Sequence, residues 1–515
     1  MDGPPLSTGG VNEEEHMTSD QHAGDLGFID GGRREPRIAI VGAGFGGIAA
    51  AVTLKRAGLT DFVVYEKSAG PGGVWWDSRY PGAEVDTPTH IYSYSFKRFD
   101  WTRSHARQAE LQRYLEETID EFGIRRHFVF GTEVAKVVWN ETARTWSLHR
   151  GGVVETFDYV VLAVGILNVP AIPSWPGMAE FAGPMFHTSR WEAEHDLTGK
   201  RVAIVGTGST AAQVVPNLAR AADHVYVFQR EPGWINPKPI TVYDEAERKA
   251  LKSRLRYRLE RIRAYRSSAA SRQGGDIHRP GTPANLEAMA RCQAFIDEVF
   301  ADRPDLAKAV TPDYPYFGKR PIKDSNFYEA LKRDNVELIP VPVERVTADG
   351  VIDAEGAHHA IDLLVLSTGF QPSKYLSQIA VYGQDGLDIQ DEWQGTPQAY
   401  LGIMVPGFPN LFMMYGPNTN SPVIVFMHEL QAKFMVGAIA SARRWRAPKI
   451  EVRRWVHRRY NAWLQSAMEG SVWATANNYF KSSTGRVVTQ WPVSPTVYWA
   501  LARFTRPLAV TVKRR

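Results

Sequence analysis

The stretch RIAIVGAGFGGIAAAVTLKRAGLTDFVVYEK, residues 37–67, decides the fold. It has the pattern of an apolar strand, a glycine turn, an alanine-rich helix and a second strand. Gly42, Gly44 and Gly47 form a GxGxxG motif between the first strand and the helix, which is typical of a dinucleotide-binding βαβ unit. Gly42 permits the tight turn, and Gly44 lets the backbone approach a pyrophosphate at the helix N-terminus.

An acidic residue ends the second strand of this unit. Glu66 follows Gly42 by 24 residues, where a carboxylate can accept hydrogen bonds from both hydroxyls of an adenosine ribose. The position therefore predicts a cofactor with a free 2′-hydroxyl, such as FAD or NAD.

The same device returns in RVAIVGTGSTAAQVVPNLARAADHVYVFQR, residues 201–230. Gly206, Gly208 and Ala211 occupy its three turn positions. Here Arg230 stands 24 residues after the first glycine, and a guanidinium at this place attracts a 2′-phosphate. The two units are therefore predicted to bind different nucleotides, and the second is suited to NADP.

Two further apolar strands, VVLAVGILNVP at 160–170 and LLVLSTGF at 363–370, each end in a turn of small residues and glycine. We interpret them as the places where the chain leaves one domain for another. The expected fold class is α/β, with two dinucleotide-binding Rossmann-like domains, the NADP domain being inserted in the FAD domain. The expected boundaries are a disordered N-terminal tail at 1–35, the first part of the FAD domain at 36–170, an interdomain linker at 171–200, the NADP domain at 201–369 with a helical insertion at 241–311, and the second part of the FAD domain with a C-terminal segment at 370–515.

The composition, with 44% hydrophobic and 23% charged residues, is that of an ordinary globular protein. The net charge of +4 is a weak argument for nucleic acid or membrane partners, and neither is expected. No apolar run reaches about 20 uninterrupted residues. The single cysteine, Cys292, and an acidic N-terminal segment without an export signal favour the cytoplasm.

A further helix is expected within the insertion at 241–311. Leu251, Leu255, Leu259 and Ile262 follow helical spacing among many arginines, which usually indicates a solvated helix face.

One cysteine excludes the redox cysteine pair of the pyridine-nucleotide disulfide reductases, so the electrons must leave the flavin for another acceptor, commonly O₂.

Two long motifs indicate which family of flavoproteins the chain resembles. FAGPMFHTSRW, residues 181–191, has a spacing that suits neither helix nor strand. Together with GGVWWDSRYPGAEVD, residues 72–86, it resembles the signatures of the Baeyer–Villiger monooxygenases. The first signature matches at Phe181, Gly183, His187 and Trp191, with Glu192 in place of Pro or Asp.

The resemblance implies a reaction and a site. NADPH would reduce FAD, O₂ would add to give a peroxyflavin, and this would attack a small hydrophobic ketone to give an ester or lactone. Arg320 would be the catalytic cation that stabilises the peroxyflavin, and Asp86 the carboxylate that holds its guanidinium. Lys319 would join Arg230 on the 2′-phosphate. Flavin monooxygenases that oxygenate amine nitrogen or sulfide sulfur carry a close variant of the first signature and remain the alternative.

Further cofactor contacts are expected around both glycine turns. His187 and Trp191 are expected to act as conformational anchors in the linker rather than as proton-transfer groups. No metal site is expected, and the oligomeric state stays open, with a monomer as one outcome. The remaining cofactor-binding residues are expected to be Phe45, Lys67, Gly73, Trp75, Trp76, Tyr92, Val134, Thr207, Ser209, Thr210, Gln213, Thr368 and Gly369.

Overall fold

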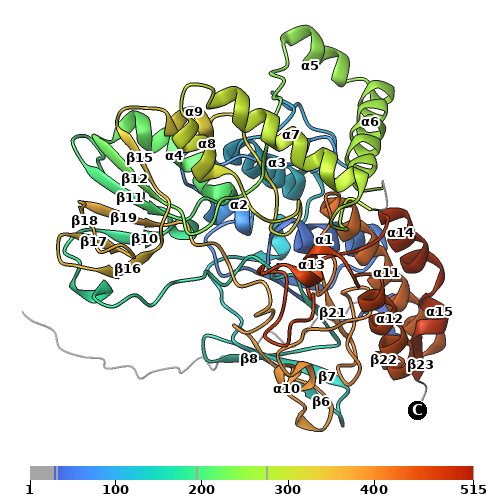
Figure 1. Ribbon diagram of the computed structural model, residues 1–515. Coiled ribbons are helices and arrows are strands. Elements are labelled where there is room, and N and C mark those ends of the chain that lie inside the picture. Colours follow the sequence, from blue (N-terminus) through green and yellow to red (C-terminus); the bar gives the residue numbers. More distant parts are fainter. Residues whose placement is uncertain (1–27, 30–32, 193–194, 274–275, 514–515) are drawn as a thin grey trace, which may run out of the picture.

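The computed structural model describes residues 28–29, 33–192, 195–273 and 276–513. Most of the tail expected at 1–35 lies outside these residues. Two five-stranded sheets, each carrying one glycine turn, form the centres of two separate bodies (Figure 1). The prediction of an α/β fold with two Rossmann-like domains is confirmed.

The first sheet has the strand order β21-β9-β3-β4-β5 and is parallel throughout. Its strands are β3 (Ile38–Val41), β4 (Phe62–Tyr65), β5 (Phe128–Val129), β9 (Tyr159–Leu162) and β21 (Leu411–Met413). Every residue of β3 and β9 is buried, as expected for central strands covered on both faces. Helix α1 (Phe45–Arg56) follows the turn and packs on α11 (Ile424–Trp445), so apolar residues surround almost its whole circumference.

The second sheet repeats this arrangement in the order β10-β19-β11-β12-β15, again all parallel. Its strands are β10 (Met185–His187), β11 (Arg201–Val205), β12 (His224–Phe228), β15 (Val336–Ile339) and β19 (Leu363–Leu366). Helix α4 (Ser209–Ala221) follows the second glycine turn, and α9 (Phe327–Leu331) packs beside it. The expectation that residues 181–191 form neither helix nor strand was wrong, because β10 pairs with β19 and the 3₁₀ helix η3 (Thr188–Arg190) follows it.

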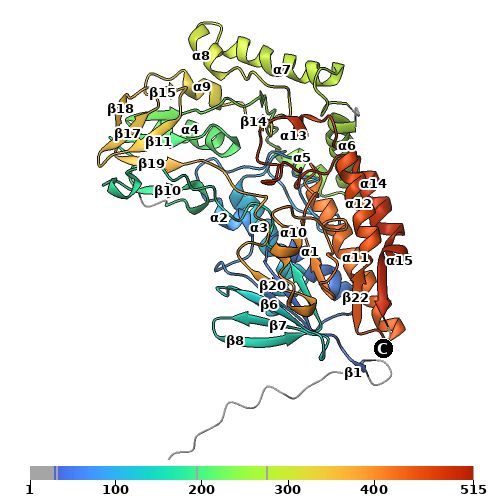
Figure 2. The same ribbon diagram turned by 60° about the horizontal axis from the view of Figure 1, so that its bottom comes forward.

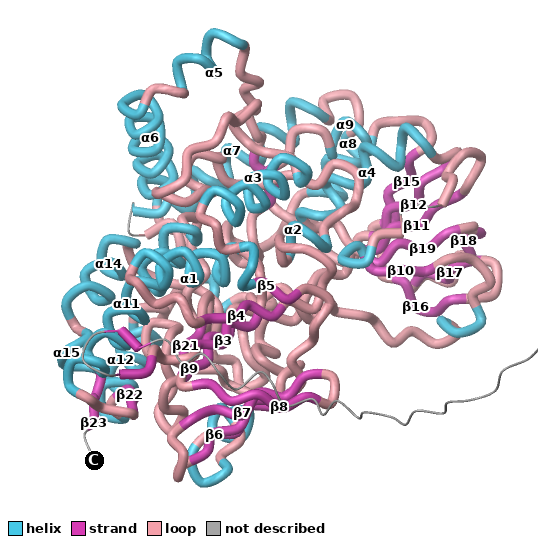
Figure 3. The backbone as a smooth tube through the Cα atoms, turned by 180° about the vertical axis from the view of Figure 1, so that it is seen from behind, coloured by secondary structure: helices cyan, strands magenta, loops and turns pink. Residues whose placement is uncertain are grey.

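Smaller elements flank each sheet (Figures 2 and 3). Beside the first sheet lie β6 (Lys136–Asn140), β7 (Thr145–Arg150), β8 (Val153–Phe157) and β20 (Ala380–Tyr382), with α2 (Val74–Asp77), α3 (Gln108–Glu121), α10 (Ile389–Trp393), η1 (Arg125–His127) and η4 (Gln384–Gly386). Beside the second lie β16 (Val343–Val346), β17 (Gly350–Asp353), β18 (His358–Ala360) and η2 (Met178–Glu180). Elsewhere are β1 (Phe28–Ile29), paired with β2 (Arg33–Arg34), and the C-terminal elements β22 (Lys449–Val452), α12 (Arg454–Ser466), α13 (Val472–Thr475), α14 (Pro495–Phe504), α15 (Arg506–Ala509) and β23 (Val510–Lys513).

A helical excursion leaves the second body between β13 (Ile235–Asn236) and β14 (Ile322–Lys323), which pair with each other. It contains α5 (Glu245–Leu251), α6 (Arg254–Gln273), α7 (Pro283–Val299) and α8 (Pro304–Val310). In the figures α6 stands at the edge of the molecule, close to the C-terminal helices (Figures 1 and 2). Among the described residues, no helix is both long and apolar enough to cross a bilayer.

The start of this excursion is fastened to the first body by backbone hydrogen bonds. Ser104 N–H donates to the Thr241 carbonyl over 2.8 Å, and Tyr243 N–H donates to the Thr102 carbonyl over 2.9 Å. We call this pairing of residues 102–104 with 241–243 the clasp. It joins the two bodies at a place far along the chain from the segments that cross between the sheets.

Candidate active site

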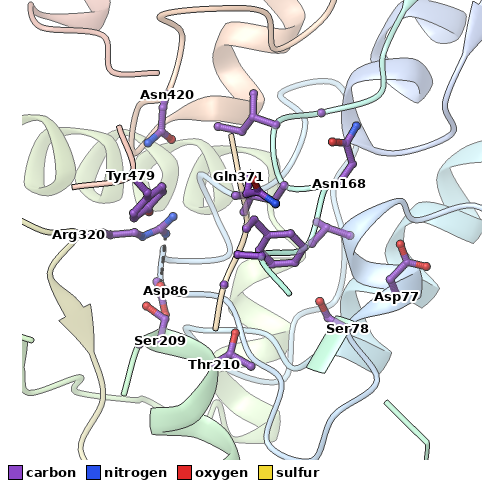
Figure 4. A pocket seen from close by; sticks show the side chains of 18 of the residues that line it. Asp77, Ser78, Asp86, Asn168, Ser209, Thr210, Arg320, Gln371, Asn420 and Tyr479 are labelled. Carbon is purple, nitrogen blue, oxygen red and sulfur yellow. Dashed lines mark hydrogen bonds and ion pairs between the residues drawn. The ribbon is translucent and has the colours of Figure 1, made fainter. Parts of the chain in front are cut away.

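A cavity of about 1470 Å³ lies between the two sheets and is lined by both glycine turns (Figure 4). It collects nearly all of the residues expected at the cofactors and in catalysis. The expected residues that line it are Gly42, Gly44, Phe45, Glu66, Lys67, Gly73, Trp75, Asp86, Tyr92, Val134, Gly206, Thr207, Gly208, Ser209, Thr210, Gln213, Arg230, Lys319, Arg320, Thr368 and Gly369.

The other expected residues lie behind the cavity wall or away from it. A Cβ at Gly47 would lie 1.9 Å from the Gly42 carbonyl oxygen, so this glycine serves the packing of α1 against the turn. Trp76 packs on Gly70 and stacks with the Arg79 guanidinium 4.4 Å from its ring. Its neighbour Trp75 does face the cavity, and its indole N–H donates to the Tyr92 hydroxyl over 3.0 Å.

The two glycine turns have nearly identical geometry. Gly42 and Gly206 both have a φ of +105°, which side chains rarely adopt. A Cβ at either position would also lie 2.5 Å from a carbonyl oxygen, that of Ala163 after β9 or that of Ser367 after β19. Each turn therefore leaves a bare backbone at the N-terminus of α1 or α4, as a dinucleotide pyrophosphate requires.

Glu66 is buried at the adenosine end of the first turn. Its Oε2 accepts a hydrogen bond from the Ala43 N–H over 2.7 Å, and its Oε1 accepts one from the Ser68 N–H over 2.9 Å. These bonds fix the carboxylate, and each oxygen keeps acceptor capacity for a ribose hydroxyl. The first turn and Glu66 thus fit the adenosine half of FAD.

The second turn ends in a group of cations. Lys319 lies beside Arg230 and contacts the Glu231 carboxylate. Burial and the nearby Arg230 charge lower the pKa of the Lys319 ammonium to about 8. Two cations that repel each other in this way are suited to share a phosphate dianion, so the site fits a 2′-phosphorylated nucleotide.

Arg320 lies in the cavity between the two turns (Figure 4). Its Nη2 donates to Asp86 Oδ2 over 3.4 Å, and the side chain remains 44% exposed because it faces the cavity. Burial would lower the pKa of Arg320, but Tyr479 and Asp86 raise it overall, so the guanidinium keeps its charge. The structure thus brings together the two residues that the resemblance paired, and it adds Tyr479, which sequence reasoning missed, as a neighbour of Arg320.

Behind Asp86 lies a chain of buried and partly buried charges that the sequence analysis missed. The Lys238 ammonium is 3% exposed and lies 2.6 Å from Glu84 Oε1 and 4.0 Å from Asp86 Oδ1. Arg103 Nη2 lies 2.7 Å from the other Glu84 oxygen. Asp86 Oδ1 has no hydrogen-bond partner among the described residues, and the Lys238 ammonium compensates its charge from 4.0 Å. Positive and negative groups therefore alternate from Arg103 to Arg320.

This charge chain crosses between the two bodies. Lys238 belongs to the segment after β13, whereas Glu84 and Asp86 belong to the first body. The Gln213 amide on α4 reinforces the crossing, since it donates to the Glu84 carbonyl over 2.9 Å and accepts from the Glu84 N–H over 3.2 Å. Gln213 was expected at the cofactor, and its contact with a cofactor stays a prediction.

The residues of the signature at 181–191 lie outside the cavity, in and around β10. The buried His187 ends β10, and its Nε2 hydrogen-bonds the Gly369 carbonyl oxygen over 3.0 Å. Burial lowers the pKa of His187. Its Nδ1 lies 2.8 Å from the Ser189 hydroxyl, and the Trp191 ring packs edge-on against Phe186. His187 is thereby joined to the turn after β19, where Gly369 lines the cavity.

Two dinucleotide-binding turns on one cavity, with an arginine–carboxylate pair between them, define an oxidoreductase that binds two nucleotide cofactors. Residues 36–267 match the pyridine nucleotide-disulphide oxidoreductase family. The chain is 36% identical over 480 residues to a Baeyer–Villiger monooxygenase of Pseudomonas aeruginosa, with 91% of this chain and 90% of the relative covered. A Baeyer–Villiger monooxygenase of Streptomyces coelicolor is 34% identical, with 88% of each chain covered. The chain belongs to the Baeyer–Villiger monooxygenases.

Solved structures agree with this assignment. The closed crystal structure of cyclohexanone monooxygenase is 30% identical and has a TM-score of 0.85. An oxidised steroid monooxygenase bound to NADP is 29% identical and has a TM-score of 0.84. Both similarities cover 93% of this chain and 99% of the solved chain.

The charge chain yields a prediction of stability. Lys238→Met leaves Glu84 and Asp86 without their shared cation, and removing one partner from such a buried group should cost about 3 kcal/mol of unfolding free energy. Urea titration followed by tryptophan fluorescence measures the loss. The matched control is Lys252→Met, since Lys252 is 68% exposed and lies 3.7 Å from Asp100. That variant should lose about 1 kcal/mol or less. Equal losses in the two variants would show that Lys238 has no special electrostatic role.

Proposed function

We propose that the protein is an FAD- and NADPH-dependent Baeyer–Villiger monooxygenase that inserts one oxygen atom beside the carbonyl of a hydrophobic ketone, giving an ester or lactone. Bound FAD, reduced by NADPH, supplies the activated oxygen that comes from O₂. The observation that carries this proposal is the position of Arg320, which faces the cavity between both glycine turns and is paired with Asp86.

Arg320 supplies a permanent positive charge where negative charge develops. Attack on a ketone carbonyl requires an anionic oxygen nucleophile and places negative charge on the carbonyl oxygen. A fixed guanidinium stabilises both, because the neighbouring Asp86 and Tyr479 hold it in place. In this role Asp86 orients the Arg320 guanidinium, and Lys238 compensates the negative charge of Asp86.

The same charge distinguishes the two candidate reactions. Oxygenation of an amine or a sulfide needs a protonated, electrophilic oxygen, whereas ester formation needs an anionic one. A guanidinium within the cavity disfavours protonation of a nearby oxygen anion. The Arg320–Asp86 pair therefore favours the ketone reaction over the nitrogen or sulfur alternative.

The cavity also supports an apolar substrate. Its lining includes Met414, Pro422, Ile424 and Val425, and the apolar share of such a wall favours burial of hydrocarbon. The segment NTNSPVIVFMH at 418–428 contributes three of these side chains. We therefore infer a ketone with substantial hydrocarbon surface.

We propose that His187 and its neighbours act as a conformational anchor for the nucleotide-binding segments and take no part in proton transfer. The His187 ring is joined to the Gly369 carbonyl, and Gly369 with Thr368 lines the cavity. Movement of β10 would therefore displace the turn after β19 through this hydrogen bond. This supports the expected role of the signature as a conformational anchor.

The proposed reaction predicts which products form. Purified enzyme with FAD, NADPH and O₂ should convert some members of a panel of cyclic, linear and aryl ketones into products heavier by one oxygen atom. Gas chromatography with mass spectrometry identifies the esters, and ¹⁸O₂ locates the new atom. Amines and sulfides serve as comparison substrates. Oxygenated amines or sulfides in the absence of any ester would favour the alternative reaction.

The role of Arg320 is tested separately from cofactor binding. Arg320→Ala should still bind FAD and still be reduced by NADPH, whereas ester formation should fall about 10²- to 10³-fold because the developing charge loses its partner. Anaerobic stopped-flow absorbance follows flavin reduction, and product analysis follows ester formation.

The control for this variant is Arg303→Ala, which removes an arginine that pairs with Asp305 on the surface near α8. It should leave both rates unchanged. Ordinary ketone turnover by Arg320→Ala would refute the assignment.

The cation group at the second turn predicts a pH dependence. The lowered pKa of Lys319, about 8, means that its charge is present below this pH and is lost as the pH rises through it. A bound 2′-phosphate favours the charged form, so NADP⁺ affinity should be constant between pH 7 and about 8 and then fall, by at most about tenfold per pH unit. Titration calorimetry from pH 7 to 9.5 measures this. Lys319→Met should bind more weakly with a flat profile; an unchanged profile would place the phosphate elsewhere.

A further inference from the structure

Helix α6 is oriented with its apolar stripe toward solvent. Leu255, Leu259 and Ile262 follow one another at helical spacing, and their exposed fractions are 69%, 53% and 48%. A surface helix of a globular protein normally turns such a stripe inward to the core. Helix α6 lies at the edge of the molecule (Figures 1 and 3). Its three aliphatic side chains are exposed to solvent instead of packing on the core.

The inward side of α6 is held by specific contacts, which fix the orientation of the helix. Tyr257 is 3% exposed, and its hydroxyl accepts a hydrogen bond from the Trp101 indole N–H over 3.3 Å. The Arg261 guanidinium donates to the His90 carbonyl over 2.6 Å and to the Ser93 carbonyl over 3.1 Å. Because these bonds face the first body, the leucines opposite them must face solvent.

Arginines surround the exposed stripe. From residue 254 to 266 the helix carries six arginines and one acidic residue, Glu260, although the whole chain has a net charge of only +4. Glu260 is already paired with Arg263 over 3.0 Å. Within the described residues, no salt bridge engages the exposed arginines Arg254, Arg256 and Arg258. Six arginines and one glutamate give this segment a net charge of +5 around an apolar stripe.

We propose that α6 docks the enzyme on the surface of an anionic lipid bilayer. The three aliphatic side chains would enter the boundary between headgroups and acyl chains, and the flanking arginines would bind the lipid phosphates. Apolar residues on one face with arginines beside them are the features by which interfacial helices bind anionic membranes. The low net charge argued against a membrane partner only because it averages over the whole chain.

Charge complementarity favours the bilayer over a second copy of the chain. A symmetric dimer through this face would bring two arginine-rich surfaces together. Such an interface would have to bury like charges, because the one acidic residue of the segment is occupied by Arg263. An anionic bilayer compensates the arginines and covers the leucines at the same time.

The test is sedimentation of the holoenzyme with vesicles. Vesicles of phosphatidylcholine mixed with phosphatidylglycerol should pellet the enzyme, vesicles of phosphatidylcholine alone should not, and added salt should weaken the binding. Leu255→Ser/Leu259→Ser/Ile262→Ser should reduce the partition coefficient about tenfold or more. Arg254→Gln/Arg256→Gln/Arg258→Gln should reduce it to a similar extent through the charge alone.

The matched control changes three exposed aliphatic residues elsewhere. Val153, Val154 and Leu286 are 45%, 56% and 53% exposed, and their replacement by serine should leave vesicle binding unchanged. Flavin absorbance and thermal melting verify that each variant is folded. Three results would overturn the proposal: no binding to anionic vesicles, equal binding by the leucine variant, or a lipid-free dimer in sedimentation velocity that the leucine variant converts to monomer.

Discussion

The ion pair between Arg320 and Asp86 is the interaction on which the proposed chemistry depends. A guanidinium that faces a cavity needs a carboxylate to hold it, and that carboxylate must itself stay charged in a partly buried place. The structure meets this need with Lys238, which compensates Asp86 and Glu84 together. The charge chain draws on both bodies, so the proposed reacting centre is complete only when both bodies contribute their residues.

Two copies of one backbone device give the enzyme two different nucleotide sites. The turns at Gly42 and Gly206 share their φ angle and their contact with a carbonyl oxygen after a parallel strand. What differs is the side chain at the end of the second strand, a fixed carboxylate at Glu66 and a cation at Arg230. We expect this difference in charge, to which Lys319 adds a second cation in the second unit, to distinguish a free from a phosphorylated ribose.

The sequence was sufficient for the parts of the site that local backbone geometry determines. The glycine turns, Glu66, Arg230 and the signature at 72–86 contribute residues to the cavity at positions that the sequence patterns mark, whereas the signature at 181–191 lies outside it. Lys238 could not be foreseen, because its carboxylate partners lie far earlier in the chain and no motif marks it. Residues 185–187 were not recognised as a strand, because this short edge element exists through its pairing with β19. For α6, spacing predicted the helix, but its orientation depends on Tyr257 and Arg261, whose partners belong to another body.

The clasp between residues 102–104 and 241–243 has a mechanical consequence. The second body is attached to the first by the segments that cross between the sheets and, separately, by these backbone hydrogen bonds. A rotation that separates residues 102–104 from 241–243 must break both of these hydrogen bonds. The clasp therefore favours those rearrangements of the nucleotide sites that keep the two segments together.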